Sequence, residues 1–475
     1  MTKFIGREKE LSLLNRFSKK RSASFLIVRG RRRIGKSRLI EEFAKPYKFY
    51  TFSGIVPTEK TTAQSQRDEF ASQLSQQDFP KVKAQDWNDL FWLLADKVKK
   101  GKVVILLDEI SWMGDKDPDF LGKLKNVWEQ HFKKNNQLIL IVCGSASSWI
   151  EKNVLSSTGF VGRISFVLTL EELPLKDCQD FWRQAAAHIS AMEKLKMLSV
   201  TGGVPRYLEE IDPALSAEAN IKNMCFTKGA FLVDEFERIF SNLFLRDSEA
   251  YKKIIEVLAT GSKEFKEVSQ LLGTDMSGRT SDYLDELILA GFVNRDYTWH
   301  LKDGKDAKLS KFRLRDNYLR FYLKYIQKYK TKIERNAFDF KSLYALPGWD
   351  AIIALQFENL VLNNRHFLWE KLSIRSEDIL SENPFFQHKT ATQLGCQIDY
   401  LIQTRFGTAY ICEIKFSKNK ITERVIEEVQ EKILRLKRPK GMSCRSVLIH
   451  VNGVENNLIE QEYFSDIIDF SEILK

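Results

Sequence analysis

The 475-residue sequence has few cysteines and no long apolar segment. Its six cysteines are scattered and form no C-x-x-C pair, which argues against a zinc site and favours a reducing compartment. No apolar run approaches the ~20 residues that a membrane helix needs, and the N-terminus lacks the apolar core of a signal peptide. These absences predict a cytoplasmic protein that has no membrane partner.

Length and charge indicate the number of domains and the kind of partner. At roughly 150 residues per domain, a chain of 475 residues is expected to form about three domains. An apolar share of 43% and a charged share of 29% are typical of a folded protein. The formal net charge of +11 favours a polyanionic partner, although a basic surface that only keeps the protein in solution would give the same value.

A glycine-rich segment lies between an apolar strand and a helix near the N-terminus. The run Phe25–Val28 predicts a buried strand, and the residues that follow the segment predict the start of a helix. Four residues have the spacing of the motif G-x-x-x-x-G-K-[ST]: Gly30, Gly35, Lys36 and Ser37. This motif in this context predicts a loop that binds the phosphates of a nucleotide.

The chemistry of the loop explains the residue types. Glycines let the backbone wrap so that N–H groups point at a phosphate, and the new helix adds its positive N-terminal dipole. Lys36 can reach the β- and γ-phosphates during catalysis, and the Ser37 hydroxyl can bind Mg²⁺. The predicted cofactors are ATP and Mg²⁺. The loop residues expected to bind the nucleotide are Gly30, Arg31, Arg32, Arg33, Ile34, Gly35, Lys36, Ser37 and Arg38.

An acidic pair ends a second apolar run. Residues Lys102–Ile110 read KVVILLDEI, which predicts a buried parallel strand whose tip emerges at the phosphate site. Asp108 would hold Mg²⁺ directly or through water, and Glu109 would activate the attacking water. A further strand, Leu138–Cys143, precedes Ser145, which could sense the γ-phosphate or cap the next helix. The repeated strand–helix units predict a parallel, three-layer α/β domain.

The order of motifs in the first half of the chain resembles the archaeal-type ATPase family, in the signalling (STAND) branch of the AAA-like P-loop ATPases. The motifs are F-x-G-R-x-x-E-L from Phe4, the phosphate loop, D-E, C-G-S from Cys143, Gly162-Arg163, and G-G-V-P-R-Y from Gly202. The resemblance implies a helical lid over the nucleotide. It implies that Arg206 is a sensor arginine that binds the nucleotide and that Arg163 is a finger-like arginine, although each position also suits a surface or cap residue.

The segment from Tyr251 to Asn294 has the pattern of three short helices, followed by a hairpin with its tip near Asp303-Gly304. It resembles a winged helix-turn-helix. In such a domain one helix would face the major groove and the hairpin would carry basic residues. The residues implied for these two roles are Ser277, Arg279 and Thr280, and Lys302, Lys305 and Lys308. Winged helices also serve as rigid spacers, so DNA binding stays open.

The segment Phe312–Tyr329 then predicts a packing helix with a solvated basic face.

Two expected strands near the C-terminus, 394–403 and 409–416, form a hairpin centred on Phe406. This centre places Asp399 opposite Glu413, with Cβ atoms ~5 Å apart, and period-2 alternation places Lys415 on the same face. Two facing carboxylates repel each other and destabilise the strand pairing unless a cation lies between them. A divalent metal would supply that cation, and the lysine could stabilise the charge that builds up on a scissile phosphate.

The pattern D-x(13)-E-x-K resembles the PD-(D/E)xK restriction-endonuclease fold, although Ile398 replaces the proline of the motif. The resemblance implies that Asp399 and Glu413 bind a second divalent metal, Mg²⁺ or Mn²⁺, with Glu358 as an accessory acid. It also implies that Lys415 is catalytic. The alternative is a surface hairpin with a cross-strand ion pair.

The sequence thus predicts an α/β protein with five parts. They are a parallel-sheet P-loop ATPase core (residues 1–170), a helical lid (171–245), a winged helix-turn-helix (246–312), a linker (313–345) and a restriction-endonuclease-like α/β domain (346–475). The function expected is ATP hydrolysis that controls a nuclease-like domain on nucleic acid, DNA rather than RNA. The alternative is an ATP-dependent switch with a non-catalytic C-terminal scaffold. A small-molecule kinase is disfavoured because no acceptor-binding motif is found, and a homo-oligomer stays open.

Overall fold

The computed structural model describes residues 4–145, 147–243, 247–273, 278–391 and 393–475. They form two compact units, the first mainly of residues up to Glu172 and the second mainly of residues from Leu173 onward. Most of the predicted lid and of the three-helix segment, and all of the linker and the C-terminal domain, belong to the second unit; Ser241–Leu245 and Leu289–Gly291 belong to the first. No helix among the described residues is long and apolar enough to cross a membrane.

The first unit contains a five-stranded parallel sheet in the order β2-β3-β4-β1-β5. Strand β4 therefore lies between the strand before the phosphate loop, β1, and the strand that ends in the acidic pair, β3. The strands are β1 (Ser24–Arg29), β2 (Lys48–Ser53), β3 (Val103–Asp108), β4 (Leu138–Gly144) and β5 (Phe166–Thr169). The expected parallel α/β core is confirmed.

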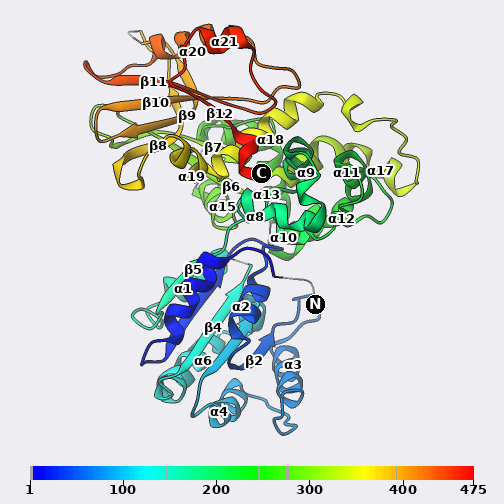
Figure 1. The fold of residues 1–475 in the computed structure, drawn as a ribbon. Helices are drawn as coiled ribbons and strands as arrows, with labels where there is room; N and C mark the ends of the chain where they lie inside the picture. The colour runs from blue at the N-terminus through cyan, green and yellow to red at the C-terminus, as the bar shows by residue number, and fades with distance from the viewer. Residues whose placement is uncertain (1–3, 146, 244–246, 274–277, 392) are drawn as a thin grey trace. The chain divides into compact units, whose positions relative to one another are not determined.

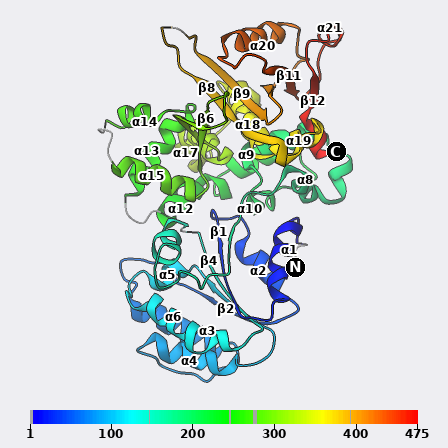
Figure 2. The ribbon, with the colours of Figure 1, turned by 90° about the vertical axis from the view of Figure 1, so that its left-hand side faces the viewer.

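Helices cover both faces of this sheet (Figures 1 and 2). Alternate residues of β1 belong to different cores: Phe25 and Ile27 pack with α3, α4 and α6, whereas Leu26 and Val28 pack with α1 and α2. This follows from the period-2 alternation of side chains along a strand. The helices are α1 (Glu8–Ser18), α2 (Lys36–Ala44), α3 (Ala63–Ser75), α4 (Trp87–Lys97), α5 (Ile110–Gly114), α6 (Phe120–Gln130) and α7 (Ser147–Ile150).

The second unit begins with short helices in the segment predicted to be the lid. Near these helices the backbones of Gly203 and Leu173 lie in close contact. A Cβ atom at Gly203 would lie 2.2 Å from the carbonyl oxygen of Leu173, and the Leu173 N–H donates to the Gly203 carbonyl at 2.8 Å. Only glycine fits there without a shift. The helices are α8 (Leu175–Cys178), α9 (Ala191–Thr201), α10 (Pro205–Leu208), α11 (Ala217–Cys225) and α12 (Phe231–Leu243).

Three helices and a hairpin follow, as the periodicity predicts. The hairpin pairs β6 with β7, and its turn contains Asp303 and Gly304, the predicted tip. Lys263, before α14, forms an isolated bridge with Phe312 of β7. The elements are α13 (Ser248–Ala259), α14 (Phe265–Leu271), α15 (Gly278–Leu289), β6 (Val293–Trp299) and β7 (Asp306–Leu314).

The C-terminal domain has a mixed sheet in the order β12-β11-β10-β9-β8. Strands β8, β9 and β10 pair antiparallel, and β10, β11 and β12 pair parallel. The strands are β8 (Ile379–Gln387), β9 (Cys396–Thr404), β10 (Thr408–Lys415), β11 (Ser443–His450) and β12 (Asp466–Asp469). The helices are α18 (Trp349–Asn363), α19 (Arg365–Lys371), α20 (Arg424–Arg435) and α21 (Asn456–Glu460).

The β6–β7 hairpin packs against this C-terminal sheet, and Figure 2 shows β6 beside β8. The Trp299 indole N–H donates to Gln403 Oε1 at 2.6 Å, and the Gln403 amide donates to the Leu301 carbonyl at 2.9 Å. Trp299 and Leu301 belong to the same hydrophobic cluster as strands β9 and β10. The hairpin is therefore part of the core of the C-terminal domain.

The linker differs from its expected form. Lys324 and Lys328 are exposed as predicted, but Arg313 and Arg320 are each only 3% exposed. Both guanidinium groups make hydrogen bonds that offset part of the cost of burial, although Arg320 Nε has no partner among the described residues. Arg313 binds Asp296 at 2.7 Å, and Arg320 donates to an amide oxygen on α18 at 2.7 Å. The linker elements are α16 (Asn317–Phe321), a π-helical turn (Tyr322–Ile326) and α17 (Gln327–Glu334).

Candidate functional site

The phosphate loop connects β1 to α2. Gly30 has φ 147°, and a Cβ atom there would lie 2.3 Å from the carbonyl oxygen of Leu170. Gly35 has φ 84° and precedes the first residue of α2, Lys36. Both glycines are thus required by the path of the backbone. The turn delivers the N-terminus of α2 to the tip of β1, the arrangement that binds a phosphate.

The Lys36 side chain is buried inside this loop. Its ammonium group donates to the carbonyl oxygens of Gly30 and Arg31, each at 3.0 Å. The loop therefore encloses a positive charge, which fits the anionic phosphates of a nucleotide.

The other predicted loop residues are placed differently. The Arg31 guanidinium pairs with Glu172 at 3.0 Å. Ile34 is 1% exposed and packs in the core, so its backbone alone can contact a nucleotide. The remaining arginines of the loop set are half-buried: Arg32, Arg33 and Arg38.

The structure brings together the two predicted magnesium ligands. The Ser37 hydroxyl donates to Asp108 Oδ2 at 2.6 Å, although the two residues come from different elements, α2 and β3. Asp108 Oδ1 accepts a hydrogen bond from the Glu109 N–H at 2.9 Å, which orients the carboxylate. A hydroxyl and a carboxylate oxygen are hard donors of the kind that Mg²⁺ prefers. These residues fit the ion that the sequence predicts.

Glu109 is held by a partner that the sequence did not identify. The Ser145 hydroxyl donates to the Glu109 carboxylate, with 2.9 and 3.0 Å to its two oxygens, and the Ser145 N–H lies 3.2 Å from Oε2. Glu109 itself has φ 48°, a left-handed conformation that is strained for a non-glycine residue. The C-G-S motif at the end of β4 was the available signal, because β4 is adjacent to β3.

The two arginines implied by the family resemblance lie in different units. Arg163, in the first unit, pairs with Glu129 of α6 at 2.8 Å. Arg206, in the second unit, pairs with Glu210 at 2.6 Å and lies over the Phe231 ring. Each has a structural role of its own, and contact of either with a nucleotide stays a prediction.

A parallel sheet with a glycine-rich loop after one strand and a serine–aspartate pair at the loop defines a P-loop ATPase core. The comparisons agree. Residues 4–211 match the sequence model of a family described as an ATPase domain predominantly from Archaea. These residues are therefore similar to ATPase domains of the archaeal type.

Three similar proteins are from the species Methanocaldococcus jannaschii, Pyrococcus abyssi and Aeropyrum pernix. An uncharacterized protein of Methanocaldococcus jannaschii is 26% identical over 347 residues, which cover 72% of this chain and 73% of the relative. The Walker-type ATPase structure of Pyrococcus abyssi has a TM-score of 0.50 at 16% identity, covering 67% of this chain and 96% of that one. The ORC2 protein of Aeropyrum pernix has a TM-score of 0.44 at 14% identity, and the match covers 68% of this chain and 94% of that one.

The C-terminal hairpin has the predicted register. Tyr400 pairs with Cys412 and Gln403 with Ala409, so the hairpin is centred on Phe406 as expected. Continuing the register by one residue places Asp399 opposite Glu413. Asp399 Oδ2 also accepts a hydrogen bond from the N–H of Ile414 at 3.0 Å.

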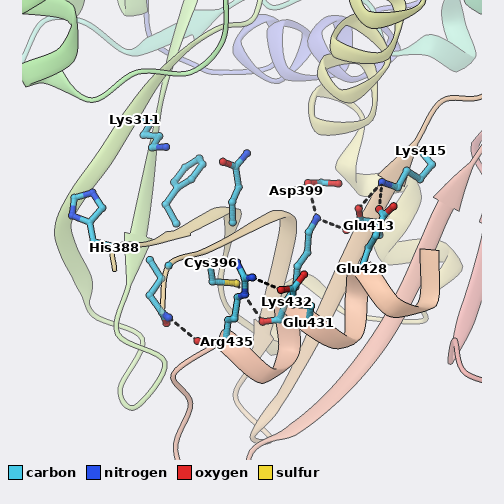
Figure 3. Close-up of a pocket in the computed structure, with 14 residues that line it drawn as sticks. Lys311, His388, Cys396, Asp399, Glu413, Lys415, Glu428, Glu431, Lys432 and Arg435 are labelled. Carbon is cyan, nitrogen blue, oxygen red and sulfur yellow. Dashed lines mark hydrogen bonds and ion pairs between the residues drawn. The ribbon is translucent and has the colours of Figure 1, made fainter. Parts of the chain in front are cut away.

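Asp399, Glu413 and Lys415 line one cavity of about 660 Å³, shown in Figure 3. The Lys415 ammonium lies 3.0 Å from Glu413 Oε1 and 2.6 Å from Glu428 Oε2 on α20. A second lysine, Lys432 of α20, lies 2.5 Å from Glu413 and 3.3 Å from Asp399. Sequence reasoning missed Lys432 because α20 carries many charged residues and nothing in their spacing selects one.

Burial and charge determine the pKa values at this site. Burial and the nearby charge of Asp399 raise the pKa of Glu413, and the two lysines oppose that rise. Burial alone would lower the pKa of Lys432, but the charges of Asp399 and Glu413 outweigh it and the pKa lies above its usual value. The site is thus a coupled set of carboxylates and ammonium groups.

Glu358, the predicted accessory acid, lies on α18. No group of three histidine, cysteine or acidic side chains within the described ranges is arranged to hold a metal ion. Burial, and then the charge of Asp399, raise the pKa of Glu358 to about 7. The charges of Asp399, Arg313 and Arg320 all act on Glu358, and its role as an accessory acid stays a prediction.

The predicted DNA-reading helix also needs a correction. Thr280 is 4% exposed and cannot contact a groove, whereas Arg279 is exposed but pairs with Asp247 at 2.9 Å. Ser277 lies outside the described residues. The predicted hairpin lysines are exposed: Lys302, Lys305 and Lys308.

Proposed function

We propose that the protein binds and hydrolyses ATP with Mg²⁺ and that its nucleotide state controls a nucleic-acid-directed, metal-dependent nuclease-like domain. The observation that carries the ATPase part is the contact of Ser37 with Asp108, directly beside Glu109. The contact brings the two predicted metal ligands together and supports Glu109, the residue after Asp108, as the general base.

Each residue of the ATP site then has a role. The loop from Gly30 to Ser37 binds the phosphates through its N–H groups, and Lys36 turns its ammonium from the loop carbonyls toward the β- and γ-phosphates. Bound Mg²⁺ would neutralise phosphate charge, held by Ser37 and Asp108. Glu109 accepts a proton from the attacking water as that oxygen bonds to the γ-phosphorus and the bond to the β–γ bridging oxygen breaks. Arg206 would contact the nucleotide from the lid.

The cavity around Asp399 supports the nuclease-like part of the proposal. Asp399 and Glu413 present carboxylates to one point, and Lys415 lies on the same face within reach of a scissile phosphate. Lys311, His388 and Arg435 line the same cavity and suit a polyanion such as DNA. Two carboxylates and a lysine fit a divalent metal and an anionic substrate.

One observation favours the second candidate function, an ATP-dependent switch with a non-catalytic C-terminal scaffold. Lys432 forms an ion pair with each of the two carboxylates, so its charge offsets part of their repulsion without a metal. In this version ATP controls partner binding or assembly into a homo-oligomer.

One set of assays tests both candidates on the purified full-length protein. MgATP hydrolysis should be lost in Lys36→Ala and Glu109→Gln. Mn²⁺-dependent cleavage of duplex or single-stranded DNA should be lost in Asp399→Ala and Lys415→Ala, while both variants keep hydrolysing ATP. Absence of cleavage under every nucleotide condition, with hydrolysis intact, would reject the nuclease-like part and favour the switch.

A further inference from the structure

The ammonium group of Lys432 lies between the two carboxylates of the C-terminal cavity. Its Nζ is 2.5 Å from Glu413 Oε2 and 3.3 Å from Asp399 Oδ1, and Figure 3 shows the side chain reaching from α20 toward both acids. Glu413 is only 2% exposed, so its charge has little access to water. Lys432 therefore supplies the cation that the facing carboxylates require.

The packing of α20 directs Lys432 to this point. Val425, Ile426 and Val429 of the helix are buried against the strands that carry the acids. Lys432 follows Val429 by three residues and so lies on the same face of the helix. The position of its side chain is thus fixed by the hydrophobic core of the domain, and a lysine elsewhere on the helix could not replace it.

A divalent cation and Lys432 compete for the same oxygens. A Mg²⁺ ion bound to Glu413 and Asp399 would lie ~2.0–2.1 Å from its ligand oxygens, in the space that the ammonium group now fills. A doubly charged ion also neutralises two carboxylates more completely than one ammonium group can. We therefore expect the two cations to exclude each other.

We propose that Lys432 is an exchangeable internal counter-ion and that a divalent cation binds Asp399 and Glu413 by displacing it. The displaced ammonium enters the cavity, where Glu428 lies one turn earlier on α20 and a phosphate group of a bound polyanion could also pair with it. Metal and polyanion then bind cooperatively, because each favours the displaced position of Lys432. This inference rests on the proposed metal-dependent site but not on cleavage.

Calorimetric titration with Mn²⁺ tests the exchange, in full-length protein whose ATP site is disabled by Lys36→Ala. In that background Lys432→Met removes the competing charge and keeps an unbranched side chain. It should bind Mn²⁺ at least tenfold more tightly than the Lys36→Ala parent. Arg424→Met, at the exposed first residue of the same helix and outside the cavity lining, should stay within twofold of the parent. Equal or weaker binding by Lys432→Met, or no Mn²⁺ binding by either protein, would overturn the proposal.

A second measurement needs no substitution at the site. Acylation of lysines in the native full-length chain, followed by peptide mass spectrometry, reports whether each ammonium group is held in an ion pair. Mn²⁺ should raise the labelling rate of Lys432 at least threefold and leave that of Lys305, on the β6–β7 turn, unchanged. An unchanged or lower rate at Lys432 would contradict the exchange. Cation exchange without DNA cleavage would remove the nuclease function alone and leave this inference standing.

Discussion

The hydroxyl of Ser145 donates a hydrogen bond to both carboxylate oxygens of Glu109, at 2.9 and 3.0 Å. The two residues follow adjacent strands, β4 and β3, of the parallel sheet. Because β4 lies between β3 and β1, the bond links the proposed general base to the strand next to the phosphate loop. Ser145 thus positions Glu109, whether or not it also senses the γ-phosphate or caps the next helix.

The first prediction concerns this bond. Replacing Ser145 with alanine removes a hydrogen bond to a charged acceptor, worth about 1.5–3 kcal/mol. If that energy holds Glu109 in the reactive position, kcat for ATP hydrolysis falls roughly 10- to 100-fold while the Kd for MgATP changes less than twofold. Steady-state hydrolysis and calorimetric MgATP binding measure the two quantities.

A nearby serine provides the control for Ser145→Ala. Ser147 is 1% exposed, and its hydroxyl has no hydrogen-bond partner among the described residues. Ser147→Ala should leave kcat within twofold of the parent. Equal losses in both variants would show that the loop tolerates no substitution and that the Glu109 contact has no special role.

The second prediction concerns nucleotide binding. Saturating MgATP should raise the melting temperature of the parent protein, by the equivalent of about 2.7 kcal/mol at a concentration of 100 Kd. Lys36→Ala should abolish this rise, since it removes the ammonium inside the loop. Lys45→Ala, an exposed residue at the end of α2, should keep it. A full shift in the Lys36 variant would show that the nucleotide binds elsewhere.

The third prediction follows from the buried carboxyl group of Glu358, whose pKa is raised to about 7 by burial and by Asp399. The unfolded chain has a pKa near 4.5, so between these values the folded protein binds more protons than the unfolded one. Stability is therefore expected to fall as the pH rises from about 4.5 to about 7. Glu358→Gln removes this loss and should stabilise the protein by about 2–3 kcal/mol at pH 8 relative to pH 5.

Urea unfolding of the parent and variant across this pH range measures the difference. Glu370→Gln, an exposed position on the following helix, serves as the control and should show the pH dependence of the parent. If Glu358→Gln keeps the parent's pH dependence, Glu358 is ionised in the folded protein throughout this range.

Local patterns predicted what depends on local geometry. The hairpin register about Phe406 follows from the positions of two strands and a short turn, so Asp399 and Glu413 could be paired before the fold was known. The contact between Ser37 and Asp108 followed from the phosphate loop and from a strand that ends in acids. The hairpin pairing follows from spacing along the chain. The contact between Ser37 and Asp108, which are 71 residues apart, followed instead from two motifs that occur together at phosphate sites.

Contacts made by side chains from distant segments were not predictable in this way. Lys432 reaches the acids because α20 packs across the sheet, and Trp299 meets Gln403 because the β6–β7 hairpin joins a separate core. Arg313 was expected to be exposed, because its partner Asp296 lies 17 residues away and the local sequence does not indicate the ion pair. A charged residue is predicted to be exposed to solvent when its partner is unknown, so sequence analysis alone misses buried ion pairs.

The last prediction distinguishes two surfaces for a polyanion. Lys305 is exposed in the turn of the β6–β7 hairpin, where a DNA-binding wing would use it. Lys311, on β7 of the same hairpin, lines the cavity of Asp399 and lies 4.5 Å from the centre of the Phe386 ring. Because the hairpin packs against the C-terminal sheet, we expect DNA to contact the cavity side.

Lys311→Ala should therefore weaken DNA binding and lower the slope of log K against log salt concentration by about one unit, whereas Lys305→Ala changes neither. Fluorescence anisotropy at several salt concentrations measures both. The reverse result would assign DNA binding to the wing and leave the cavity without a polyanion.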